Sequence, residues 1–121
     1  MVPAVMAELT VYEKRTCTTC KNLATLLGER GIDYDAVDFH LEPLDADELR
    51  ELVRKAGVPA RELFRTREPV FAELGLADRE VSDDEAIALM AEHPQLLQRP
   101  VVVRGDRAVL ARPIERVLEL L

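Results

Sequence analysis

The chain has 121 residues, of which 48% are apolar and 32% are charged, and its formal net charge is −7. This is close to the commonest domain length, so residues 1–121 are expected to form one domain, with a core of Leu, Val, Ala and Ile because Trp is absent. The acidic balance argues against non-specific binding of nucleic acid, and no apolar run approaches the ~20 residues that cross a bilayer, so neither nucleic acid nor a membrane is an expected partner.

The chain opens on residues 1–7, which lack the basic and long apolar regions of a signal peptide. We expect a frayed leader there, with Met6 as an alternative start. The chain contains two cysteines, Cys17 and Cys20. Without an export signal they indicate a reducing cytoplasm, where such a pair is more often catalytic or metal-binding than a structural disulfide.

A strand–helix–strand unit is predicted near the N-terminus. The apolar run Leu9–Tyr12 predicts a strand, and the helical pattern after it is capped by Thr18 or Thr19 and runs to about residue 30. Residues 33–39 alternate between polar and apolar side chains, which predicts a second strand. A βαβ unit of this length implies that the two strands are parallel.

A helical insert is predicted over about residues 43–97. Asp45 caps a helix that ends at Gly57, and a short helix follows at residues 60–64. The sequence of residues 82–85 has the S-x-x-E form of a capping box, so another helix begins there.

The C-terminal part predicts a β-hairpin and a closing helix. Residues 100–103 and 108–111 are β-rich, the intervening residues 104–107 have the composition of a turn, and Pro113 begins a helix. The residues expected to face inward from this helix are Val117, Leu118 and Leu121. The order β-α-β, helical insert, β-β-α predicts the α/β class, with a mixed sheet of the thioredoxin-like type.

The cysteines form a CxxC motif between a predicted strand and a predicted helix, which is typical of a thioredoxin-like redox site. A helix N-terminus favours the thiolate, which is the nucleophile. Cys17 is expected to be the more exposed and more acidic thiol, and Cys20 is placed to attack an adduct on Cys17. The alternatives are two ordinary buried thiols or a metal site. Zinc needs about four ligands and the remaining candidates, His40 and His93, are isolated, so no metal is predicted.

Three arginines stand at element boundaries beside polar or proline-bearing stretches: Arg65, Arg99 and Arg112. Arginine suits fork-like binding of tetrahedral oxyanions, but spacing alone does not distinguish these three from the other arginines of the chain. Arg99 also precedes Pro100 at the start of a β-rich run. With a CxxC motif upstream, a cis peptide bond facing the redox cysteine is favoured over an ordinary trans proline.

Several short segments occur in an order and spacing that resembles the arsenate reductase family with a glutaredoxin-like fold, whose relatives include Spx-type transcription regulators. They are Tyr12 to Cys17, Glu42-Pro43-Leu44, Phe64-Arg65-Thr66-Arg67, Glu73-Leu74-Gly75-Leu76, Glu92-His93-Pro94 and Gln98-Arg99-Pro100. The resemblance covers about residues 8–120, and the combination of segments is more specific than any one of them.

The resemblance implies that Cys17 attacks arsenate and that Arg65, Arg99 and Arg112 hold the oxyanion. Backbone N–H groups after Cys17, those of Thr18 and Thr19, are expected to assist, because a helix N-terminus binds anions. No bound cofactor is expected. An external thiol reductant would reset the disulfide, and Cys20 favours thioredoxin over glutathione with glutaredoxin.

Two positions depart from the family's pattern. The enzymes coupled to glutathione commonly have His and Arg where this chain has Glu13 and Lys21. Lys21 keeps a positive charge near the thiolate, whereas a carboxylate at Glu13 would raise a cysteine pKa. Two other functions stay open, a redox-sensing regulator that binds RNA polymerase and a general dithiol oxidoreductase. The arginines at positions 65 and 112 favour an anion-binding enzyme over the regulator.

Overall fold

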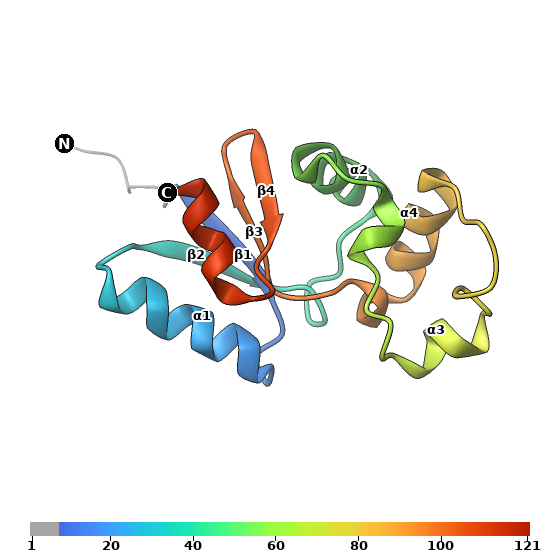
Figure 1. Cartoon of the computed structure of the whole chain (residues 1–121), viewed down its shortest axis with the longest axis horizontal. Coiled ribbons are helices and arrows are strands. Elements are labelled where there is room, and N and C mark those ends of the chain that lie inside the picture. The colour runs from blue at the N-terminus through green and yellow to red at the C-terminus, as the bar shows by residue number, and fades with distance from the viewer. Residues whose placement is uncertain (1–7) are drawn as a thin grey trace.

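The computed structural model describes residues 8–121, so the expectation for residues 1–7 lies outside the described residues (Figure 1). Four strands form one sheet in the order β2-β1-β3-β4. Their bounds are β1 (Leu9–Glu13), β2 (Tyr34–Asp38), β3 (Val101–Arg104) and β4 (Arg107–Leu110). β1 pairs with β2 in parallel, and the β1–β3 and β3–β4 pairs are antiparallel. The predicted mixed sheet and thioredoxin-like fold are confirmed.

The helix α1 (Thr18–Glu29) follows β1 and buries Cys20, Leu23 and Leu27. The prediction that Thr18 or Thr19 caps it is wrong, because both threonines lie inside the first turn. The N-cap is Cys17, whose sulfur accepts the backbone N–H of Cys20 at 3.4 Å. The first residue of the CxxC motif therefore replaces the usual hydroxyl or carboxylate cap.

The helical segments between β2 and β3 are α2 (Ala46–Ala56), η1 (Ala60–Leu63), α3 (Pro69–Glu73), α4 (Asp83–Glu92) and η2 (Pro94–Leu96). As predicted, Asp45 caps α2, and it forms a reciprocal capping box with Glu48. α2 ends at Gly57, whose φ of 67° lies in the left-handed region that favours glycine.

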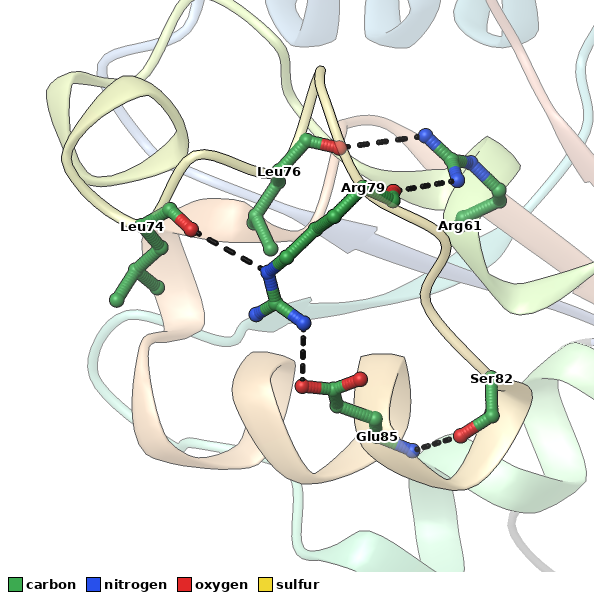
Figure 2. A network of polar contacts seen from close by, with 6 residues as sticks. All are labelled: Arg61, Leu74, Leu76, Arg79, Ser82 and Glu85. Atoms are coloured by element: carbon green, nitrogen blue, oxygen red, sulfur yellow. Dashed lines mark hydrogen bonds and ion pairs between the residues drawn. The ribbon is translucent and has the colours of Figure 1, made fainter.

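Two arginines fix the loop between α3 and α4, as Figure 2 shows. Arg61 donates to the carbonyl oxygens of Leu76 and Arg79, and Arg79 donates to the carboxylate of Glu85 at 2.7 Å. Ser82 caps α4 by accepting the Glu85 N–H at 3.1 Å. Glu85 thus supplies its N–H to the predicted cap while its carboxylate binds an arginine.

The two faces of the sheet pack against different helices. On one face, α1 and η3 (Ile114–Leu120) cover a cluster that includes Leu9, Val11 and Val102. On the other face, α2, α4 and their neighbours cover a cluster that includes Val101 and Ala108. Successive strand residues such as Val101 and Val102 point to opposite faces, so one short strand serves both cores.

The closing helix η3 corrects one prediction. Val117 is buried as expected, but Leu118 and Leu121 are 40% and 46% exposed, and Leu120 is buried in their place. η3 is a 3-10 helix, which has three residues per turn. This period aligns Ile114, Val117 and Leu120 on one face. Within the described residues, no helix is both long and apolar enough to cross a membrane.

Candidate active site

The polar groups that could carry chemistry gather at one edge of the sheet. β1 and β2 end at this edge, antiparallel β3 begins there, and β4 ends there. The edge therefore receives the loop that leads to Cys17, the residue Arg99 just before β3, and Arg112 just after β4. Asp38 closes β2 at the same place. The topology thus brings together segments that are far apart in the sequence.

Both cysteines are free thiols, and both are buried. Cys17 is the more exposed of the two, with 8% of its surface accessible against 3% for Cys20. The backbone holds Cys17 from both sides, since its N–H donates to Lys14 at 3.0 Å and its carbonyl accepts the N–H of Lys21 at 3.0 Å. The nucleophile predicted from the sequence therefore has a fixed position at the start of α1.

The environments of the two thiols separate their pKa values. Burial alone would raise the pKa of Cys17, but hydrogen bonds from the side chain and backbone N–H of Cys20 and from Arg99 outweigh it and lower the pKa. Burial and the hydrogen bond between the Cys20 thiol and Cys17 raise the pKa of Cys20 to about 12, and the charge of Glu13 adds to the shift. Cys17 is thus the thiol whose surroundings favour the thiolate, and Cys20 is the thiol whose surroundings favour the protonated form.

Arg99 is the cation beside the Cys17 thiol. It is 8% exposed, and its Nε–H is buried without a hydrogen-bond partner among the described residues. Lys21, for which a supporting charge was expected, lies on an exposed part of the first turn of α1. Arg99, which is distant from the CxxC motif in the sequence, therefore adds a positive charge near Cys17.

Arg65 and Arg112 belong to the same cluster as Arg99. Arg112 donates to the carbonyl oxygen of Arg99 at 2.8 Å. Burial lowers the pKa of Arg65, the positive charges of Arg99 and Arg112 lower it further, and Glu68 opposes them. Around Arg65, the guanidinium groups of Arg99 and Arg112 thus lie near one carboxylate, that of Glu68, a local excess of positive charge that suits an anion.

Gln98 organises this cluster, a role that the sequence analysis missed. Its side-chain oxygen accepts from Arg65 Nη1 at 3.0 Å and from the backbone N–H of Arg99 at 3.1 Å. Its own N–H donates to Leu63 at 2.8 Å, which ties the cluster to η1. Gln98 stands next to Arg99 in a motif of the resemblance, but its contacts depend on a residue that is distant in the sequence.

The peptide bonds of Arg99–Pro100 and Arg112–Pro113 are both cis. The first was predicted, and the second was not. Pro100 is buried directly before β3, and the N–H of Ala111 donates to its carbonyl oxygen at 2.9 Å. Arg99 and Arg112 therefore each precede a cis proline at this edge of the sheet.

Asp38 connects the end of β2 to the cysteine loop and was also missed. Its carboxylate accepts the backbone N–H groups of Arg15 and His40, each at 2.9 Å, and that of Leu41 at 3.3 Å. Although its partial burial acts in the opposite direction, these bonds lower its pKa, so Asp38 stays ionised. A carboxylate that accepts several N–H groups orders the loop that presents Cys17.

The histidines do not join the cysteines in a metal site. Over residues 8–121, no group of three or more His, Cys, Asp or Glu side chains is arranged to hold a metal ion. The His40 ring packs at a tilt against Phe39 with ring centroids 4.8 Å apart, and both its ring nitrogens are buried without a partner among the described residues. Burial and the charges of Arg99 and Lys14 lower its pKa, so His40 is neutral near pH 7.

The chain is similar in sequence and in fold to several known proteins. Residues 12–120 match the model of the ArsC family. The chain is 36% identical over 114 residues to the uncharacterized protein YfgD of Escherichia coli. The aligned region covers 93% of this chain and 96% of that protein. It is 32% identical over 113 residues to the arsenate reductase of Neisseria meningitidis serogroup A, spanning 93% and 97% of the two chains. The solved structure of an arsenate reductase from Vibrio cholerae superposes with a TM-score of 0.89 at 33% identity, covering 97% and 100% of the two chains.

Proposed function

The chain belongs to the ArsC family, as its motifs predicted, and from this premise we propose that it reduces arsenate with its own pair of thiols. The observation that carries the proposal is the lowered pKa of the Cys17 thiol, which owes part of the shift to the buried guanidinium of Arg99 nearby. A nucleophilic sulfur beside an excess of positive charge suits an anionic, electrophilic substrate. The relatives named above support an enzyme and give no support to the transcription regulator.

In the proposed complex, arsenate lies between Cys17 and the arginine cluster. The buried Nε–H groups of Arg65 and Arg99 have no hydrogen-bond partner among residues 8–121, so both can donate to arsenate oxygens. The Nε of Arg65 lies 3.6 Å from the Glu68 carboxylate, which is an ion pair without a hydrogen bond. The N–H groups of Thr18 and Thr19 at the start of α1 face the same anion.

The first step is attack on arsenic. The Cys17 thiolate forms a sulfur–arsenic bond, and one arsenate oxygen leaves as water after taking up protons. Arg112 acts through Arg99, because its bond to the Arg99 carbonyl fixes the cation beside the thiolate. Preorganised donors of this kind stabilise charge that develops in the transition state.

The second step is the redox step. Cys20 attacks the sulfur of Cys17, the disulfide forms, and the sulfur–arsenic bond breaks with its electron pair moving to arsenic. Arsenic is reduced from the pentavalent to the trivalent state, and the two thiols are oxidised to one disulfide. The electrons come from the cysteines, so this chemistry needs no bound cofactor.

A dithiol enzyme of this kind needs an external thiol reductant. Thioredoxin fits best, since it reduces an intramolecular disulfide by thiol–disulfide exchange, whereas glutathione with glutaredoxin would suit a single-cysteine adduct. The cytoplasm, which keeps thiols reduced, is the compartment that supports such a cycle.

An NADPH-consumption assay tests the proposal. The protein is supplied with arsenate and either thioredoxin with its reductase or glutathione with glutaredoxin and its reductase. We expect arsenate-dependent consumption, faster with thioredoxin. Consumption that proceeds with small disulfides but never with arsenate would contradict the proposal and favour a general dithiol oxidoreductase.

A further inference from the structure

Glu13 lies in the same layer as Cys20, between the sheet and α1. Leu9, Val11 and Glu13 alternate along β1 on one face, and the first two pack in the cluster that contains Leu23 and Leu27 of α1. Cys20 lies on this same buried face of α1. The carboxylate at the end of β1 is therefore directed toward the first turn that holds the resolving thiol.

Two neighbouring carboxylates, those of Glu13 and Asp38, differ in how readily they can accept a proton. Asp38 is the partner of Glu13 in the β1–β2 register, and the charge of Glu13 also raises the pKa values of Tyr34 in β2 and Cys20 in α1. Asp38 is committed to three backbone N–H groups. Burial and the charge of Asp38 raise the pKa of Glu13, so Glu13 is the carboxylate better suited to take up a proton.

The proposed resolving step requires such an acceptor. Cys20 holds its proton firmly while Cys17 is a thiolate, because burial and the hydrogen bond to Cys17 both favour the protonated form. Once Cys17 carries an adduct, its charge and that hydrogen bond are lost. The remaining obstacle is removal of a proton from a buried thiol, and a base next to the thiol solves it.

We propose that Glu13 is the general base that accepts the Cys20 proton as Cys20 attacks the Cys17 adduct. The bond between Cys17 and its adduct breaks, the disulfide forms, the leaving group departs with its electron pair, and the proton moves to the Glu13 carboxylate. Glu13 is only partly buried, so it returns the proton to solvent. The inference rests on the resolving role proposed for Cys20, but it does not depend on which oxyanion is the substrate.

The test uses dithiobis(nitrobenzoate) in place of arsenate. Cys17 releases one nitrothiobenzoate as it forms a mixed disulfide, and Cys20 releases a second as it closes the protein disulfide. Stopped-flow absorbance separates the two releases. Cys20→Ser should abolish the second release. If it does not, the resolving role itself is wrong, and this outcome is independent of any result with arsenate.

Glu13→Gln should slow the second release at least about tenfold near pH 7 and leave the first release unchanged. In this variant, the rate of the second release should rise about tenfold per pH unit. In the native protein, the same rate should depend only weakly on pH between pH 6 and 9. Glu13→Asp should keep this weak dependence on pH. Asp35→Asn, on the exposed side of β2, is the matched control and should match the native protein.

The alternative role of Glu13 gives the opposite result. If Glu13 only raises the Cys20 pKa by its charge, Glu13→Gln lowers that pKa and the second release becomes faster. An equal or faster second release with an unchanged pH profile would overturn the proposal.

Discussion

The thiol region and the arginine region of this protein meet at one edge of the sheet but are built in different ways. The thiol region, residues 14–20, is one continuous turn from β1 into α1. The arginine region brings together Arg65, Gln98–Arg99 and Arg112 from three places in the chain. The comparison shows that a local motif supplies Cys17 together with the hydrogen bonds from Cys20 that lower its pKa most, while long-range packing adds the charge of Arg99.

The largest effect should come from the thiol region. Cys17→Ser should reduce arsenate turnover to background, because a hydroxyl of high pKa cannot replace the thiolate as nucleophile. The NADPH-coupled assay measures the loss. Thr16→Ser, next to Cys17 and exposed, serves as the control and should keep its activity. Retained turnover in Cys17→Ser would move the chemistry away from this region.

Cys20→Ser should stop multiple turnover with thioredoxin while still allowing arsenate to react with Cys17. The reason is that the adduct forms on Cys17 alone, whereas the thioredoxin cycle needs the intramolecular disulfide. Mass spectrometry of trapped protein and steady-state assays together distinguish the two steps. A variant that cycles normally with thioredoxin would show that Cys20 is not the resolving residue.

Arg99 connects the two regions, because it belongs to the arginine region and lowers the pKa of Cys17 in the thiol region. Arg99→Ala should lower kcat/KM for arsenate about 100-fold, since it removes a preorganised cation from the anion. It should also raise the Cys17 pKa, because Arg99 is one of the groups that lower it. Iodoacetamide alkylation as a function of pH measures that pKa.

Arg107→Ala is the matched control for Arg99→Ala. Arg107 is exposed in the β-hairpin and donates to the Glu119 carbonyl oxygen at 3.1 Å, away from the thiols. Both the Cys17 pKa and arsenate turnover should be unchanged in this variant. An unchanged Cys17 pKa in Arg99→Ala would mean that the two regions are electrostatically independent.

The smallest effect should come from Asp38, which orders the thiol region from β2. Asp38→Asn should destabilise the fold by about 1 kcal/mol at pH 7, discounted for the exposure of the carboxylate. Because the folded-state pKa is lowered, the stabilisation is fully present above the unfolded pKa of ~3.9 and is lost as pH falls through the folded value. Urea unfolding at pH 7 and pH 3 measures this. An equal difference at both pH values would mean that the charge of Asp38 contributes nothing.

The local elements could be predicted from the sequence. The turn residues, the Asp45 cap and the alternation along the strands act over a few residues, so they indicate the elements wherever they occur. The period of the closing helix could not be predicted in this way, because η3 is a 3-10 helix packed on the sheet and buries Leu120 instead of Leu118 and Leu121. The cap of α1 was missed because a thiol is an unusual cap.

The sequence by itself determined the CxxC motif, its place before a helix and the order of strands around it. The resemblance to the arsenate reductase family, and not the spacing of residues, distinguished Arg65, Arg99 and Arg112 from the other arginines of the chain. Only the tertiary structure decided that Arg99 lies at the Cys17 thiol, that Gln98 joins Arg65 to Arg99, and that Glu13 shares a layer with Cys20. The physical reason is that helix starts and turns are set by neighbouring residues, whereas the pKa of a thiol depends on burial and on charges that only chain topology brings near it.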